Sequence, residues 1–128
     1  MKGIKKEMLK IYVPYSNLDW LNYKLVEKEI TFHHLKKKED GGKTEIKNGA
    51  LLMPIAHQYL HLIEYWDIET YITINNILKY VNFQKYEPTI EQRCMLEYLL
   101  CEFERKHKND KTKKGKDLIL FKYLDRGL

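Results

Sequence analysis

The sequence predicts an α+β fold in which a small β-hairpin packs on a helix and further helices extend this core. Residues 30–35 read ITFHHL, a run of β-branched and aromatic residues that is typical of a strand. Apolar residues recur at helical spacing after Pro54, after Asp67 and after Thr89. The chain has 128 residues, 44% of them hydrophobic, which is the length of one domain and enough apolar material for a modest core.

The N-terminal part is basic at first and then aromatic. Ser16 is placed to cap a short helix over residues 18–25. We divide the single domain 1–128 into an N-terminal extension (1–29), a hairpin-and-helix core (30–66), a helical extension (67–107), and a basic connector followed by a C-terminal strand or arm (108–128).

The hairpin is expected to begin with the strand at residues 30–35. A charged run follows, and Gly41 and Gly42 then give the chain a turn. Either glycine could take a positive φ there. We expect the second short strand at residues 44–46.

Three helices are expected after the hairpin. Pro54 suits the first turn of a helix that ends near Trp66, and Asp67 is placed to cap the next one. In that second helix Asn75, Asn76 and Lys79 are expected on the polar side, opposite the apolar residues Ile68, Tyr71, Ile72, Ile74, Ile77, Leu78 and Val81. Thr89 and Gln92 then form a capping-box pattern before a helix that runs to about Lys106. Its expected buried stripe is Ile90, Cys94, Leu96, Leu99, Leu100 and Phe103.

The two cysteines are expected to be small core residues of that last helix. Cys94 and Cys101 are seven residues apart, which places their Cα atoms about 10 Å from each other on a helix. A disulfide cannot close over that distance.

Composition indicates a soluble, cytoplasmic protein. The mean hydropathy is −0.58. No apolar run approaches the roughly 18 residues that span a bilayer, and the N-terminal residues lack the apolar stretch of a signal peptide.

Positive charge is concentrated in a few segments of the chain, whose formal charge is +5. One group of lysines adjoins the histidine pair at residues 33 and 34, and a second lies in the connector 108–116. We expect these surfaces to approach the phosphates of DNA, although a charge run of this kind can also be only a solvated surface. The candidate contacts are Lys36, Lys37, Lys38, Lys111, Lys113, Lys114 and Lys116.

Four of the five histidines fall between residues 33 and 61, and this concentration is the most informative feature of the sequence. His57 and His61 are four apart on the expected helix, so one metal ion can reach both. Adjacent residues on a strand point to opposite sides, so only one histidine of the pair can join that ion. A divalent metal with one spare histidine nearby is suited to hydrolysis, because a neutral imidazole can take a proton from an attacking water.

These residues resemble the HNH endonucleases of the ββα-metal type. That family's pattern is a His-His or Asp-His pair on the first strand, a Gly-Gly loop, an Asn, and a helical His nine residues after the Asn. Here the last two are Asn48 and His57, and His61 matches the extra helical ligand of the colicin-type DNases. The resemblance covers roughly residues 30–65.

The resemblance implies a role for each of these residues. His33, His57 and His61 would ligate one divalent ion (Zn, Ni, Mn or Mg), and His34 would be the general base. Asn48 would fix the loop and orient the strand that carries His34. The reaction would be hydrolysis of DNA phosphodiester bonds to 5′-phosphate and 3′-hydroxyl ends.

Three functions fit the sequence. The first is a metal-dependent DNA endonuclease. Its phage or mobile-element type is suggested by the family it resembles and not by any residue. The second is a catalytically inactive module of the same shape that binds nucleic acid or protein, as an inhibitor or adaptor. The third is a small structural metal domain. A protein partner and the oligomeric state are left open.

Overall fold

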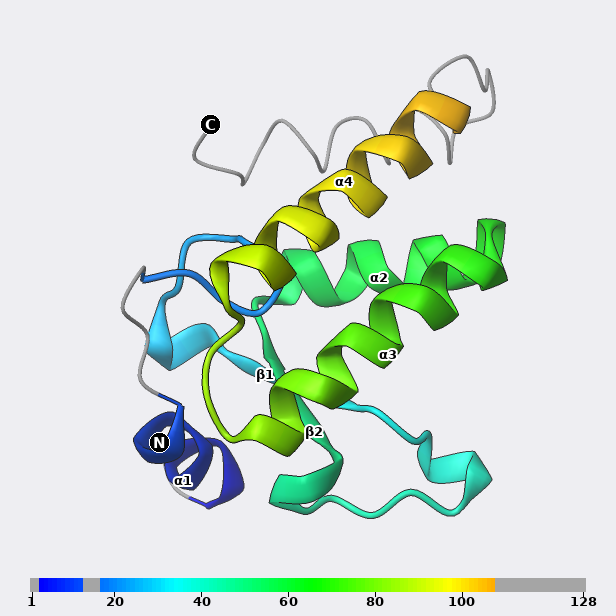
Figure 1. The fold of residues 1–128 in the computed structure, drawn as a ribbon. Coiled ribbons are helices and arrows are strands. Elements are labelled where there is room, and N and C mark those ends of the chain that lie inside the picture. Colours follow the sequence, from blue (N-terminus) through cyan, green and yellow to red (C-terminus); the bar gives the residue numbers. More distant parts are fainter. Residues whose placement is uncertain (1–2, 13–16, 108–128) are drawn as a thin grey trace.

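The computed structural model describes residues 3–12 and 17–107 and confirms the α+β class (Figure 1). The strands β1 and β2 pair antiparallel, with Thr31 opposite Leu52 and His34 opposite Gly49. In Figure 1 the helices α2 and α3 run beside each other next to this hairpin, and α4 lies above them in the upper part of the view. The elements are α1 (Ile4–Ile11), β1 (Thr31–His34), β2 (Gly49–Leu52), α2 (Pro54–Trp66), α3 (Ile68–Gln84) and α4 (Ile90–His107).

The second strand lies later in the chain than we expected. Residues 44–46 form no strand, and Ile46 begins a short 3₁₀ turn, Ile46–Asn48. The strand is instead residues 49–52, GALL, and all four are buried. Its position is interior, so it is filled by small and apolar residues, and the β-branched residues at 44 and 46 gave a misleading signal.

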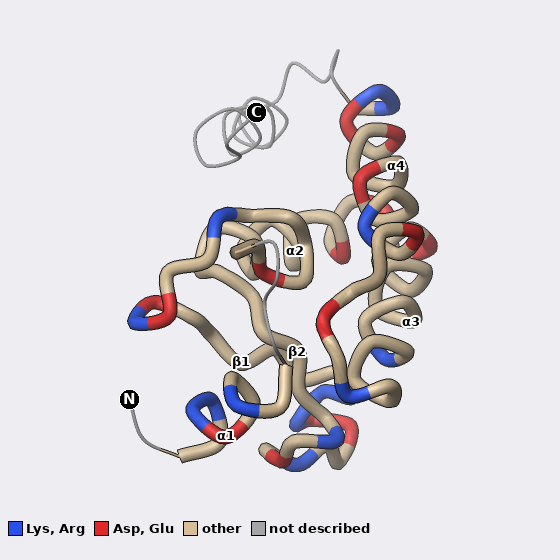
Figure 2. Tube along the Cα trace, turned by 60° about the vertical axis from the view of Figure 1, so that its left-hand side comes forward, with Lys and Arg blue, Asp and Glu red and all other residues tan. Residues whose placement is uncertain are grey.

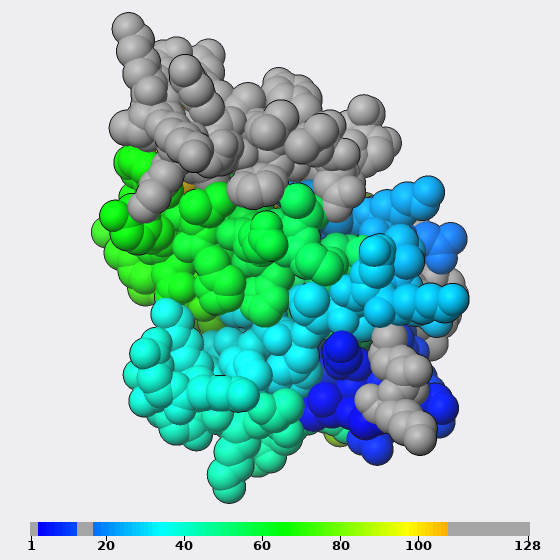
Figure 3. Space-filling model, turned by 180° about the vertical axis from the view of Figure 1, so that it is seen from behind, coloured from blue at the N-terminus to red at the C-terminus, as the bar shows by residue number. Residues whose placement is uncertain are grey.

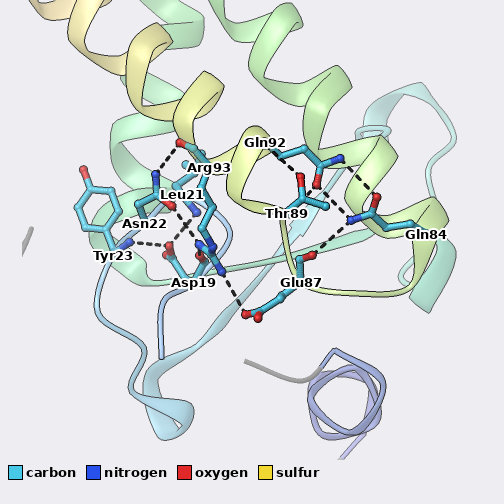
Figure 4. A network of polar contacts seen from close by, with 9 residues as sticks. All are labelled: Asp19, Leu21, Asn22, Tyr23, Gln84, Glu87, Thr89, Gln92 and Arg93. Atoms are coloured by element: carbon cyan, nitrogen blue, oxygen red, sulfur yellow. Dashed lines mark hydrogen bonds and ion pairs between the residues drawn. The ribbon is translucent and has the colours of Figure 1, made fainter. Parts of the chain in front are cut away.

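The N-terminal part also differs from the prediction. Residues 18–25 form no helix, and Leu18 and Lys24 pair there in an isolated antiparallel bridge. The buried carboxylate of Asp19 organises this loop, because its Oδ1 accepts hydrogen bonds from the backbone N–H groups of Leu21 and Tyr23 (Figure 4). Its Oδ2 accepts the N–H of Met53, which immediately precedes α2. The expected cap Ser16 lies outside the described residues.

The helices after the hairpin follow the prediction closely. α2 covers the expected residues 54–66, with proline in its first turn. Asp67 caps α3 by accepting the Thr70 N–H at 3.2 Å. Thr89 and Gln92 form the reciprocal capping box ahead of α4, with contacts of 2.9 and 3.1 Å (Figure 4). Caps and helical spacing therefore identified three of the helices correctly.

The buried face of α4 is narrower than predicted. It packs through Leu96, Leu100 and Phe103, spaced four and three residues apart. Ile90 is 82% exposed, and Cys94 and Cys101 are exposed free thiols. The prediction of core cysteines was wrong, because at about 100° per residue both positions turn away from that stripe.

No helix within residues 3–12 and 17–107 is long and apolar enough to cross a membrane. The predicted connector and C-terminal strand or arm, residues 108–128, lie outside the described residues.

Candidate metal centre

The fold brings His33, His57 and His61 together. Each offers one ring nitrogen, and these three atoms all lie within 4.8 Å of one another. The grouping arises because β2 leads directly into α2, so that the beginning of this helix lies against β1. His33 is only 2% exposed, His57 is half-buried and His61 is exposed. The cluster is therefore closed on the β1 side and open on the His61 side.

Each of the three rings has a polar partner on its outer side. The Nε2 atom of His33 is 2.8 Å from the Oδ1 of Asn75 in α3. The Nδ1 atom of His57 is 3.0 Å from the hydroxyl of Thr31. These contacts leave the Nδ1 of His33 facing the Nε2 of His57 at 3.4 Å.

His61 has its partner on its own helix. Its Nδ1 lies 3.3 Å from the carboxylate of Glu64, one turn further along α2. Lys37 pairs with the same carboxylate through its Nζ.

The donor set fits a divalent transition metal. Two metal–nitrogen bonds of about 2.0–2.1 Å at a tetrahedral angle hold their nitrogens about 3.4 Å apart. The His33–His57 separation has this value. Three imidazoles suit borderline ions such as Zn²⁺ better than Mg²⁺, which prefers oxygen ligands.

The electrostatics keep the two inner rings neutral near pH 7. Burial lowers the pKa of His33 from 6.5 to about 4. Burial also lowers the pKa of His57 to about 4, with further lowering from His33 and His61. A neutral imidazole has one bare nitrogen, and a metal ion requires this form.

His34 stands apart from the three clustered rings. The strand turns it to the other side of β1, where its Nε2 lies 2.8 Å from the hydroxyl of Thr44. Its ring contacts Phe32 edge to face, with centroids 4.7 Å apart. Burial and the charge of Lys38 lower the pKa of His34. The ring is therefore held in one place and favours the neutral form.

Asn48 closes the loop between the two strands. Its Oδ1 accepts the Lys36 N–H at 2.7 Å, and its Nδ2 donates to the carbonyl oxygens of Lys36 and Lys43, both at 2.9 Å. Since Lys36 is two residues beyond His34, this side chain fixes the end of the strand that carries His34. In Figure 3 the loop, in cyan, forms the lower left of the molecule below the green helices α2 and α3.

The predicted lysines separate into three groups. Lys36 and Lys38 are exposed on the loop. Lys37 is half-buried and pairs with Glu64, and also with Glu39 at 3.7 Å. The connector lysines Lys111, Lys113, Lys114 and Lys116 lie outside the described residues. Figure 2 shows the charge asymmetry, with α1 mostly basic and acidic positions recurring along α4.

Four residues around the site were not identified from the sequence: Thr31, Thr44, Glu64 and Asn75. Glu64 had a usable signal, because it is three residues after His61 on the predicted helix. Asn75 had none. It was expected on the polar side of α3, yet it is only 6% exposed and reaches across to β1.

No family model, curated protein or solved structure matches the chain.

Proposed function

We propose that the protein is a metal-dependent endonuclease of the HNH type that hydrolyses DNA phosphodiester bonds, of phage or mobile-element type. The observation that carries this proposal is the separation of two kinds of histidine. One ring nitrogen from each of three histidines lies within 4.8 Å of the other two. His34 is instead turned to the other side of β1, with the Thr44 hydroxyl at its Nε2. The order of a hairpin followed by a helix, with candidate ligands on β1 and α2, agrees with the pattern of that family.

His34 is the general base of the proposed reaction. In the proposed reaction Nε2 donates its hydrogen to the Thr44 hydroxyl, 2.8 Å away, which leaves Nδ1 bare to take a proton from the attacking water. The water oxygen then bonds to phosphorus as the bond to the 3′-oxygen breaks, and the released 3′-oxygen takes a proton from solvent. The products are 5′-phosphate and 3′-hydroxyl ends. His33, His57 and His61 would hold a divalent ion, which would supply positive charge for the phosphate oxygens and the leaving group. Asn48 keeps His34 at a fixed angle by holding the loop at Lys36.

The open side of the site favours catalysis over a purely structural metal. The His61 side chain is 52% exposed, so the three-histidine cluster is open to solvent on that side. Structural zinc sites are filled by four protein ligands, whereas catalytic sites hold three and leave one open. Lys36 and Lys38 are exposed on the adjoining loop and can contact DNA phosphates.

The metal site is tested by calorimetry on the wild type and three single variants. We expect about one ion per chain, with Zn²⁺, Ni²⁺ or Mn²⁺ bound more tightly than Mg²⁺. His57→Ala and His61→Ala should each weaken binding. His107→Ala, which removes the histidine at the end of α4, is the control and should leave the affinity unchanged. Unchanged affinity in either of the first two variants would remove that residue from the ligand set.

The base is tested by plasmid nicking with each metal and with EDTA. His34→Ala should retain metal and DNA binding but lose cleavage by about 10²- to 10⁴-fold. Loss of metal binding would mean that the roles of His33 and His34 are exchanged. A wild-type protein that binds DNA and metal but cuts with none of the ions would instead be the inactive binding module.

A further inference from the structure

We propose that Asn75, Thr31 and Glu64 are positioning residues that fix which ring nitrogen of each clustered histidine is bare and faces the metal position. The proposal rests on the metal-binding part of the proposed function and is independent of DNA cleavage. It follows from the donors and acceptors that surround each ring.

Asn75 determines the proton position on His33. Its Nδ2 donates to the carbonyl oxygen of Leu35 at 2.9 Å, and a carbonyl can only accept. The amide is therefore oriented with Oδ1 toward His33. Oδ1 also only accepts, so the Nε2 of His33 must carry the hydrogen in their 2.8 Å contact. The bare nitrogen of His33 is then Nδ1.

Thr31 determines the proton position on His57 by the same logic. A hydroxyl has a single hydrogen, and that of Thr31 is donated to the carbonyl oxygen of Leu52 at 2.7 Å. The oxygen of Thr31 must therefore accept from the Nδ1 of His57, 3.0 Å away. The bare nitrogen of His57 is Nε2.

Glu64 acts in this way on His61. A carboxylate paired with Lys37 can only accept, so it takes the hydrogen from the Nδ1 of His61. In the neutral ring of His61, Nε2 is then the bare nitrogen, as it is in His57. The carboxylate also opposes the positive charge of Lys37 beside the site.

The three assignments together place two bare nitrogens opposite each other. The Nδ1 of His33 and the Nε2 of His57 are 3.4 Å apart with no hydrogen between them, so their contact is not a hydrogen bond. Two lone pairs facing each other repel, and a cation bound to both removes the repulsion. The protein therefore holds the ligands ready for the ion before it arrives. Since Asn75 lies in α3, the helical extension takes part in the metal centre of the hairpin and α2.

Long-range ¹H–¹⁵N NMR on the metal-free protein reads these proton positions directly. At neutral pH we expect His33 with its hydrogen on Nε2, and His57 and His61 with theirs on Nδ1. A hydrogen on the Nδ1 of His33 or on the Nε2 of His57 would overturn the proposal, even in a protein that cuts DNA. The expected pattern in a protein that never cuts DNA would support this proposal and leave only the nuclease function refuted.

Variants of Asn75 separate positioning from folding. Asn75→Leu should lower Zn²⁺ affinity by about 10- to 100-fold, the usual effect of removing a hydrogen-bond partner of a metal ligand. The hydrogen of His33 should then no longer be confined to Nε2. Asn75→Asp keeps an acceptor oxygen and should retain the Nε2 proton and most of the affinity. Asn76→Leu is the matched control, because Asn76 is the exposed neighbour on α3 and should behave as wild type.

Glu64 provides a second test if Asn75→Leu does not fold. Glu64→Gln retains an acceptor oxygen, whereas Glu64→Ala removes it from the open side of the site. We expect Glu64→Ala to bind Zn²⁺ more weakly than Glu64→Gln, with the unfolding temperature of the two metal-free variants alike. Equal affinities in the two variants would overturn the role given to Glu64.

Discussion

Gly42 shows how a single residue positions the loop beside His34. A Cβ added there would lie 1.9 Å from the carbonyl oxygen of Lys36 and 2.9 Å from the Nδ2 of Asn48. That carbonyl is the one to which Asn48 donates. The neighbouring Gly41 has a different requirement, because its φ is +89° while its surroundings are open. One glycine is needed for space and the other for backbone conformation.

Alanine at these two positions should therefore have different effects. Gly41→Ala should lower the free energy of unfolding by about 1–2 kcal/mol, the cost of a left-handed conformation for a residue with a Cβ. Gly42→Ala should cost more and should also reduce DNA cleavage, because the loop must move away from Asn48. Urea unfolding and plasmid nicking measure the two effects. A Gly42→Ala protein that cuts DNA at the wild-type rate would contradict the role of this loop in holding His34.

At the scale of one element, two asparagines of α3 donate hydrogen bonds to backbone carbonyls of the hairpin. Asn75 and Asn82 are seven residues apart, so they lie on one face of the helix two turns apart. Asn75 donates to the Leu35 carbonyl just beyond β1. Asn82 donates to the carbonyl oxygens of Ile46 and Gly49, at 2.6 and 2.7 Å, where β2 begins. Both ends of the loop are thus tied to the same helix.

Asn82→Leu should destabilise the fold with little direct effect on the metal ligands. Removing the amide leaves two carbonyl groups without this donor, which should lower the free energy of unfolding by about 2–4 kcal/mol. Zn²⁺ affinity of the folded variant should fall much less than in Asn75→Leu. If the two variants lose the same affinity, α3 acts on the site only through general packing, and Asn75 has no special role.

The elements that could be predicted are those with local signals. α2, α3 and α4 were found because Pro54, Asp67 and the Thr89–Gln92 pair mark where they begin. β2 was misplaced because its register depends on burial against other elements, which a short apolar run does not reveal. α1 was missed although Ile4, Met8 and Ile11 follow helical spacing, and Met8 is buried in the structure.

The same division holds within the candidate site. Histidine spacing identified the three clustered rings, because His57 and His61 lie four apart on one helix. Asn75 could not be found in this way. An asparagine is normally a surface residue, and its burial depends on a partner 42 positions away in the sequence.

At the scale of the whole molecule, the Asp19 carboxylate joins separate parts of the chain (Figure 4). It binds backbone N–H groups of its own loop and of Met53 at the start of α2. Arg93 of α4 donates to the backbone carbonyl of Asp19 at 2.8 Å and pairs with Glu87 at 3.3 Å. Burial raises the pKa of Asp19 to about 6, although these N–H groups and the charge of Arg93 pull it downward. The protonated form is therefore stabilised by folding.

The stability of the metal-free protein should consequently depend on pH between about 6.5 and 4. His33 and His57 have a pKa of 6.5 when exposed and about 4 when folded, so in this range the unfolded chain binds protons that the folded chain does not. Each histidine then contributes stability above pH 6.5 that is lost as the pH falls, by at most about 1.4 kcal/mol per pH unit. Asp19 acts in the opposite sense between about 3.8 and 6, since its folded form binds the proton more tightly.

Urea unfolding in EDTA at several pH values measures the balance of these three groups. With two histidines against one carboxyl group, we expect the wild type to lose stability as the pH falls from 6.5 to 4. His33→Gln should flatten this dependence, because it removes the more buried of the two histidines. Asp19→Asn should steepen it, whatever its effect on stability at pH 7, because the opposing group is gone. A His33→Gln protein with the wild-type slope would show that His33 is protonated in the folded protein over this range, and that the ring is not held as a neutral ligand.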